Sequence, residues 1–418
     1  MKLLATALVS SSSLVAVAPA QNAAGVEQRL ADLERRVAES GKFGRGGWDD
    51  GFFLESADGR SRLNVSMLLQ TLGTVHESDA QRLDEFDLQR MRVAFEGELY
   101  GRYLFSVEPQ YQPDGVDLAE AWVGARLCED SLFMAGRAKV PFSLEEMVPR
   151  RHIDFVNFST LNQFAPAEDH GLVVRGRTLE NHLEYGLSAT NGTAGDENND
   201  QKELGARAVW HVFGNETARE LQFGIAGTTG RAFADLDGVE IENETKQVVT
   251  AFEPGTELDG TRTRVAVEGA WLDGPFGIYG EWMRIDQDLA NGANAREVGL
   301  EGFWIAGTWV LTGESKRFSG VRPGHPFVPG GDGNGAWQLA LRYSQLDLGD
   351  EFVSLGAISP TAFPESISTL DVGLNWHMTN HSKLRMHVVH TTYDERIDVG
   401  SQRVSEETAL VVQYQFNL

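Results

Sequence analysis

Basic side chains recur in this sequence on the polar side of segments that alternate between apolar and polar residues. In "GAWQLALRYSQLDL", residues 335–348, Leu339, Leu341 and Tyr343 share one side and Arg342 stands on the other. Alternation with period two indicates a β-strand whose two faces meet different environments. A guanidinium group presents several donors in a planar fork that matches an oxyanion. Arginines repeated on such faces therefore indicate contact with anions.

Charged residues are too frequent on these polar faces for a packed core, so we expect the faces to line a wet channel. Fixed positive charges along an anion path must each hold an ion weakly enough to release it to the next. The alternative is that the arginines pair with Glu96, Glu98 and Glu120 and only brace the wall of a nonselective pore, since such pairs cost little beside water. The charged residues on the polar faces include Arg90, Arg92, Glu96, Glu98, Arg137, Lys139, Arg207 and Arg342.

Alternating segments of this kind, separated by Gly, Asn and Asp turns, number sixteen between residues 61 and 418. An even number of segments of about ten residues is typical of an up-and-down barrel in a bacterial outer membrane. A β-sandwich alternates in the same way, but aromatic residues near the segment ends fit the girdle of a membrane barrel. We therefore expect an all-β fold, a transmembrane β-barrel of about sixteen antiparallel strands over residues 46–418. The girdle residues are Trp337, Tyr343, Trp376, Tyr414 and Phe416.

Composition and the first residues place the protein outside the cytoplasm. The 418 residues carry a formal net charge of −25, which argues against a nucleic-acid partner whose phosphates need neutralising Lys and Arg. Residues 1–20 combine Lys2, an apolar run and the end Ala18-Pro19-Ala20, which is typical of a signal peptide. No other apolar run is long enough for a spanning helix, so a closed barrel is the expected way into a membrane.

Residues 21–45 are expected to form a short periplasmic segment before the barrel. Apolar residues at spacings of four, three and four predict a helix with a coiled-coil seam, followed by a Gly-rich joint. Two heptads are marginal alone, so the seam would need an oligomer held together elsewhere. A surface helix packed on its own chain is the alternative. The seam residues are Val26, Leu30, Leu33 and Val37.

Two long stretches interrupt the strand pattern, at residues 141–169 and 314–335. Stretches of this length without regular structure are usually functional or disordered. Bacterial barrels keep long loops outside the cell and short turns in the periplasm, so both stretches are expected on the extracellular rim.

Motifs for catalysis are not found. The sequence has no GxSxG, no HExxH, no Walker loop and a single cysteine, so no catalytic residue, metal site or cofactor is expected. A plugged barrel that acts as a binding or structural protein remains an alternative, and it would pass no steady current. The histidines are scattered, without a serine at motif spacing: His152, His170, His377 and His387.

Six runs, taken in order, resemble the family of phosphate-selective porins O and P. The resemblance covers about residues 50–418 and implies a sixteen-stranded outer-membrane barrel that assembles as a homotrimer. It also implies a long loop after the fifth strand that folds into the lumen and narrows it, and arginines and lysines that pass phosphate or pyrophosphate. The runs are "GELYGRYLF" (97–105), "GRAKVPFSLEE" (136–146), "VLTGESKRF" (310–318), "GAWQLALRYSQLDL" (335–348), "LDVGLNWHMTNHSKLRMHVVHTTY" (370–393) and the closing "LVVQYQF".

The family's basic positions are matched on two strands. An arginine pair on the inner wall of the second strand corresponds to Arg90 and Arg92. On the fifth strand Arg137 and Lys139 match, and alternation would then turn Met134 toward lipid.

The constriction loop departs from the family pattern. Its nearest basic residues, Arg150 and Arg151, stand where the family has lysines, and Glu145 and Glu146 precede them. The chain also ends beyond Phe416, which is a departure from the usual terminal Phe of barrel-insertion signals.

These observations predict a passive outer-membrane diffusion channel for phosphate or related anions. A weakly selective porin for small hydrophilic solutes is the alternative. The acidic stretches 196–200 and 330–335 would hold divalent cations that bridge lipopolysaccharide, or be solvated loops, the latter being favoured by their incomplete ligand spacing. The predicted pore-lining residues are Arg90, Arg92, Arg137, Lys139, Arg150, Arg151 and Arg342.

Overall fold

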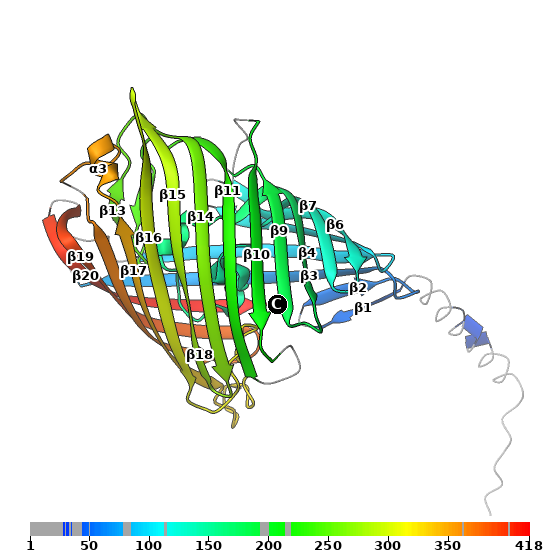
Figure 1. Cartoon of the computed structure of the whole chain (residues 1–418). Helices are drawn as coiled ribbons and strands as arrows, with labels where there is room; N and C mark the ends of the chain where they lie inside the picture. Colours follow the sequence, from blue (N-terminus) through cyan, green and yellow to red (C-terminus); the bar gives the residue numbers. More distant parts are fainter. Residues whose placement is uncertain are drawn as a thin grey trace, which may run out of the picture.

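The computed structural model describes residues 44–49, 51–77, 85–112, 115–192, 200–213, 219–361, 363–399 and 402–418, with five helical residues between 28 and 35. The described residues form a closed barrel of sixteen antiparallel strands, as the alternation predicts (Figure 1). These are β3 (Arg62–His76), β4 (Glu85–Leu99), β5 (Tyr103–Gln112), β6 (Gly115–Cys128), β7 (Ser131–Lys139), β8 (Glu168–Thr178), β9 (Leu183–Thr190), β10 (Glu203–His211), β11 (Arg219–Asp235), β14 (Thr256–Asp273), β15 (Phe276–Asn291), β16 (Asn294–Val310), β17 (Ala336–Leu348), β18 (Ser366–His377), β19 (Ser382–Val399) and β20 (Gln402–Asn417).

Short elements occupy the ends and the interior of the barrel. Two pairs of short strands lie outside the sixteen, and the helices whose bounds are described have at most five residues. These elements are β1 (Arg45–Trp48), β2 (Phe52–Glu55), β12 (Glu240–Glu242), β13 (Val248–Ala251), the helices α2 (Leu144–Met147) and α3 (Glu351–Leu355), and the 3-10 helices η1 (Arg150–His152) and η2 (Thr160–Phe164). Among the described residues, no helix is both long and apolar enough to cross a bilayer.

Alternation along each strand separates the two faces of the wall. On β17, Leu341 and Tyr343 are 50% and 38% exposed on the outer face, while Arg342 between them is 1% exposed on the inner face. A side-chain period of two fixes this arrangement, because a shift by one residue would turn every apolar group inward. The stretch that the sequence singled out is therefore a wall strand, with Arg342 on its inner side.

Pairing between β3 and β20 closes the barrel. The side chains of Gln70 and Gln415 lie opposite each other on the inner face and are hydrogen-bonded at 2.8 Å. The backbone N–H of Leu418 donates to the carbonyl of Met67 at 2.9 Å, so the last residue still belongs to the wall. Beyond it, β2 continues the pairing along β3, and β1 pairs with β2.

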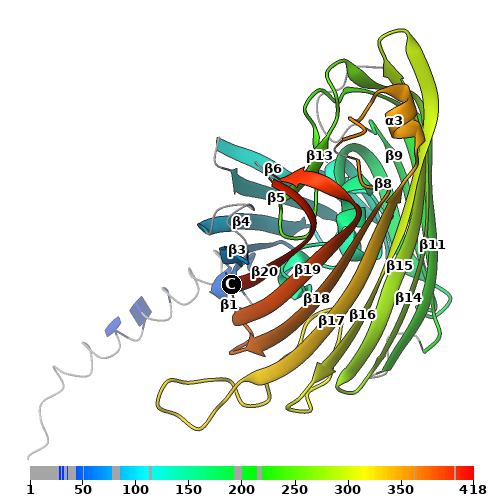
Figure 2. The same cartoon turned by 90° about the vertical axis from the view of Figure 1, so that its left-hand side faces the viewer.

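Two long connections fold into the barrel, and the first residues of a third, 311–335, reach in to meet them. Residues 140–167, between β7 and β8, hold α2, η1 and η2, and both views place them inside the wall (Figure 1 and Figure 2). Residues 236–255, between β11 and β14, hold the hairpin of β12 and β13. Residues 311–335 connect β16 to β17.

The connection 311–335 corrects one expectation. Seven strands separate it from the connection 140–167, and an odd number of antiparallel strands puts two connections at opposite ends of a barrel. Figure 1 shows the segment 311–335 at the end opposite to α3. It therefore lies on the rim where β3 begins and β20 ends, and the expectation that both long stretches share the extracellular rim was wrong.

The inner wall over β15 to β17 carries a packed apolar patch beside polar groups such as Arg342, so the interior is not the continuous wet channel that was expected. Ile285, Trp304 and Leu346 point inward there and are buried. The inserted loops pack Phe155 and Phe252 into the same apolar core. Removing this apolar surface from water holds the loops against one side of the barrel. Alternation could not reveal this, because the loop residues that cover the wall are distant in sequence.

The predicted signal peptide and coiled-coil seam lie outside the described residues. Of the seam positions Val26, Leu30, Leu33 and Val37, none is described. That part of the sequence analysis stays a prediction.

Candidate functional site

A cavity of about 230 Å³, here called the basic cavity, lies against the inner faces of β4, β6 and β8 and beside the loop 140–167. The strands position their side chains by alternation: Arg92 follows Met91, which is 37% exposed on the outer face. The loop adds two residues of the short helix η1, which begins after Pro149. Five basic and three acidic residues line the cavity: Arg92, Lys139, Arg150, Arg151, Arg175, Glu96, Glu108 and Glu120.

Three of the five basic groups are bound to other protein groups. Arg92 Nη1 lies 3.1 Å from a carboxylate oxygen of Glu108. Arg150 Nη2 lies 3.2 Å from Glu146, whose main-chain carbonyl accepts a hydrogen bond from Lys139. Glu146 is therefore bound by two of the predicted pore-lining residues, Arg150 through its carboxylate and Lys139 through its main-chain carbonyl.

Arg151 and Arg175 have no such partner. Neither guanidinium has a carboxylate within ion-pair distance in the described part of the chain. Arg151 donates from Nε to Nε2 of His152 at 3.1 Å. Burial, with Arg151 and Lys383 nearby, lowers the pKa of His152 to about 3, so its ring is neutral and can accept this bond.

Arg151 lines three cavities at once. Besides the basic cavity it borders one of about 520 Å³ and one of about 220 Å³. The larger one also contains Arg177, Arg207, Arg219 and Arg317. Arg151 thus lies at the junction of the cavities that the described residues enclose on this side of the loop.

Arg342 holds both inserted loops against the wall. Its Nη1 lies 2.8 Å from Glu145 of the first loop, and its Nη2 contacts Glu244 of the second. Asp371, 3.7 Å away on β18, is a third carboxylate around the same guanidinium. Burial raises the pKa of Glu244 to about 7, although the charge of Arg342 opposes this. The guanidinium also lies 4.4 Å from the ring centre of Phe155.

The remaining two predicted residues lie outside the basic cavity. Arg90 donates to the side-chain oxygen of Gln70 on the inner wall, and its Nε is buried without an acceptor. Arg137 donates to the main-chain carbonyl of Ala119 at 3.3 Å.

The orientation of β7 differs from the expectation. Met134 is 1% exposed and packs on Trp122 and Val173 inside the barrel, and Arg137 has the opposite parity. The physical reason is an apolar patch on the inner wall, which makes both faces of β7 partly apolar and leaves alternation unable to orient it.

Sequence reasoning missed Arg175. It lies on the inner face of β8 in "GLVVRGRT", two residues after the buried Val173. The exposed Leu172 marks the outer face, so the parity of this strand was the signal that could have identified it.

Comparison with known proteins agrees with this geometry. Residues 73–418 match the family described as phosphate-selective porin O and P. The chain belongs to this family. Porin O of Pseudomonas aeruginosa is 25% identical over 126 residues, which are 28% of this chain and 27% of Porin O. The match therefore spans only about a quarter of that relative.

Solved porin structures share the fold. The outer-membrane channel DcaP of Acinetobacter baumannii is 10% identical with a TM-score of 0.54, covering 87% of this chain and 99% of DcaP. An anion-selective porin from Comamonas acidovorans is 10% identical with a TM-score of 0.53, covering 86% and 100%. Salmonella typhi OmpF is 11% identical with a TM-score of 0.55, covering 90% and 100%.

The family and the fold confirm three predictions. The chain is an outer-membrane β-barrel, it belongs to the family of phosphate-selective porins O and P, and this family supports a channel function. Its solute is a separate question, because identities this low show the fold alone.

Proposed function

We propose that this outer-membrane channel passes phosphate and related oxyanions by passive diffusion, and that Arg151 and Arg175 contact them. The observation that carries the proposal is the basic cavity, where five basic side chains outnumber three acidic ones. A guanidinium without a carboxylate partner offers its donors to a passing anion. The partnered groups Arg92, Lys139 and Arg150 add positive charge to the same cavity.

Weak, repeated binding suits conduction. An ion must be held strongly enough to enter and weakly enough to leave, which several separate cations achieve better than one closed site. Arg317 of the neighbouring cavity of about 520 Å³ continues the basic surface beyond Arg151, whereas Arg177, Arg207 and Arg219 there are paired with carboxylates. We therefore propose that anions move from the basic cavity past Arg151 into this second cavity.

The acidic residues favour a second candidate function. Glu96, Glu108 and Glu120 face the same cavity, and Glu108 is paired with Arg92. Such pairing is expected of a weakly selective porin for small hydrophilic solutes, in which the basic groups stabilise the wall through ion pairs.

Single substitutions separate the two candidates. Arg151→Gln and Arg175→Gln remove positive charge without leaving a buried carboxylate unpaired. Each is expected to lower the anion-over-cation permeability ratio, measured as the zero-current potential in a planar bilayer across a KCl gradient. Arg403→Gln is the matched control, because this arginine is exposed on β20 and pairs with Asp398. Unchanged ratios in both test variants would leave the weakly selective porin as the function.

We also propose a homotrimer and contact with lipopolysaccharide. A solved OmpT of Vibrio cholerae with the same fold is described as a trimer form. The apolar outer face offers the surface that neighbouring subunits or lipid would cover.

Of the two acidic stretches, most of 196–200 lies outside the described residues, and 330–335 lies on the rim where β3 begins and β20 ends. We therefore propose that other loops contact lipopolysaccharide.

A further inference from the structure

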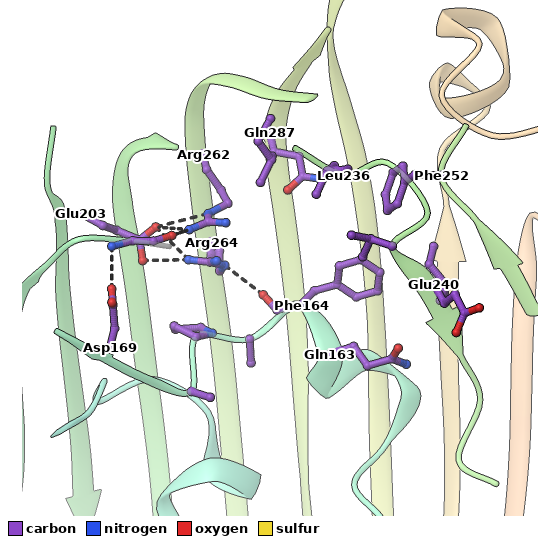
Figure 3. A pocket seen from close by; sticks show the side chains of 17 residues that line it. Gln163, Phe164, Asp169, Glu203, Leu236, Glu240, Phe252, Arg262, Arg264 and Gln287 are labelled. Atoms are coloured by element: carbon purple, nitrogen blue, oxygen red, sulfur yellow. Dashed lines mark hydrogen bonds and ion pairs between the residues drawn. The ribbon is translucent and has the colours of Figure 1, made fainter. Parts of the chain in front are cut away.

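A further cavity, here called the amphiphilic cavity, shares no lining residue with the basic cavity. It has a volume of about 360 Å³, within the range of roughly 300–1,000 Å³ that small-molecule sites occupy. The end of the loop 140–167, the loop 236–255 and the inner faces of β10 and β14 enclose it (Figure 3). Its two sides differ in chemistry.

The charged side is built around Glu203 of β10. Nη2 of Arg262 lies 3.1 Å from its carboxylate, and Nη1 of Arg264 lies 2.8 Å from it. Nε of Arg264 also donates to the carbonyl of Phe164 at 2.9 Å, which joins the loop to the wall. One carboxylate cannot neutralise two guanidinium groups, so this group of three is left with a positive charge.

Both arginines keep unused donors although they are largely buried. Arg262 and Arg264 are 9% and 6% exposed. Among the hydrogen bonds of the described residues, none is made by Nη1 of Arg262 or by Nη2 of Arg264. Both nitrogen atoms belong to side chains that line the cavity, so an acceptor placed there takes their hydrogen bonds.

The other side of the cavity is apolar. Figure 3 shows Leu236 and Phe252 across the cavity from the two arginines, with Phe164 between. Ile241 and Leu258 complete this side and are 2% and 9% exposed. Burial of an apolar or aromatic group of a ligand against this wall is favourable.

The remaining charges limit the ligand to a single negative charge. Asp169 and Glu240 also line the cavity, and with Glu203 they outnumber the two arginines. Asp169 is occupied, since its oxygens accept the backbone N–H groups of His170 and Gly192 at 2.7 and 2.6 Å. The single positive charge left on Arg262, Arg264 and Glu203 can offset one negative charge of a ligand but not several, because Asp169 and Glu240 add negative charge to the same cavity.

We propose that the amphiphilic cavity binds a small organic monocarboxylate with a compact apolar body, such as an arylacetate. The carboxylate takes the free donors of Arg262 and Arg264, and the apolar body lies against Phe164 and Phe252. This goes beyond the proposed function, because binding at this cavity requires neither anion selectivity nor phosphate passage.

Equilibrium binding tests the proposal without any conductance measurement. Phenylacetate is titrated into the folded full-length protein in detergent by isothermal calorimetry, with phenylacetamide as its neutral analogue. Arg262→Gln removes one of the two arginines and leaves Glu203 paired with Arg264. Val239→Asp places a carboxylate on the apolar side at a residue that is 45% exposed, so it leaves folding unaffected. Arg403→Gln is the matched control, because this arginine is exposed and lines none of these cavities.

The proposal predicts that phenylacetate binds and that phenylacetamide binds about tenfold more weakly or not at all, since a charge-assisted pair is lost. Arg262→Gln and Val239→Asp are expected to weaken binding by a similar factor, and Arg403→Gln to leave it unchanged. Equal affinity for the neutral analogue, displacement by inorganic phosphate, or full binding by Val239→Asp would overturn it.

Discussion

Arg342 and Arg151 carry the same side chain in opposite situations. Arg342 is 1% exposed among the carboxylates of Glu145, Glu244 and Asp371, so its charge is used inside the protein. Arg151 borders three cavities without a carboxylate partner among the described residues. We therefore assign Arg342 to holding the loops and Arg151 to meeting solute.

This assignment predicts different effects of substitution. Arg342→Ala leaves three buried carboxylates without their cation, and removing one partner of a buried pair costs about 3–5 kcal/mol. We expect the urea midpoint of unfolding to fall accordingly, and the loop 140–167 to become sensitive to protease. Arg151→Ala serves as the comparison and is expected to leave the free energy of unfolding within about 0.5 kcal/mol of wild type. Equal loss of stability in both variants would contradict the assignment.

His152 predicts a pH dependence of stability. Its pKa is about 3 in the folded protein and 6.5 ordinarily, so the unfolded chain takes up the proton first as the pH falls. The contribution of His152 is complete above pH 6.5 and declines below it by up to about 1.4 kcal/mol per pH unit. Urea midpoints between pH 7 and pH 4 are expected to fall more steeply for wild type than for His152→Gln. Parallel curves would show that His152 is not buried in its neutral form.

At the residue scale, alternation predicted which side chains point inward but not what they touch. It oriented Arg92 and Arg342 as the structure has them. It could not pair Arg342 with Glu145 or Glu244, which lie on loops distant in sequence. It failed for Met134, where both faces of the strand are partly apolar, and it overlooked Arg175.

At the element scale, the loops from opposite ends of the barrel meet inside it. Lys316 of the connection 311–335 lies 2.8 Å from Asp154 of the loop 140–167, and both are buried. Burial alone would raise the pKa of Asp154, but Lys316 outweighs it and holds this pKa well below its usual range. Tyr279 and Gln338 also donate to Asp154. The loop 140–167 is therefore also held by a connection that enters from the opposite end of the barrel.

A double-mutant cycle tests this fastening. Lys316→Met and Asp154→Asn each break the buried pair and are expected to cost about 3–5 kcal/mol in the free energy of unfolding. The double variant is expected to cost clearly less than the sum, because neither charge is then left alone. Urea titrations of the three variants measure the coupling. Additive losses would mean that the two loops are held independently.

The sequence analysis placed the strands better than the loops. Sixteen alternating segments correspond to sixteen strands because alternation records the two environments of each wall residue. The connection 236–255 was not recognised as a loop that enters the barrel; its short strands β12 and β13 pair with each other. The connection 311–335 was assigned to the wrong end of the barrel, although the odd number of strands between it and the connection 140–167 predicts the correct end.

At the scale of the whole molecule, the barrel closes without the first residues of the chain. The β3–β20 pairing joins the wall, and β1 and β2 only extend one edge of it. We therefore expect deletion of residues 21–43 to leave a folded barrel that forms the proposed trimer, measured by native mass spectrometry. The full chain without this deletion is the control. Monomers from the deletion variant alone would instead assign trimer formation to the predicted coiled coil.

The central claim is that the basic side chains, rather than the net charge of −25, determine what passes. The most direct measurement is the zero-current potential of the purified wild-type protein in a planar bilayer across a KCl gradient, repeated while phosphate is titrated. We expect a potential that reports anion preference, and a chloride current that phosphate reduces as it occupies the cavity at Arg151 and Arg175. Cation preference, or a chloride current indifferent to phosphate, would contradict the account.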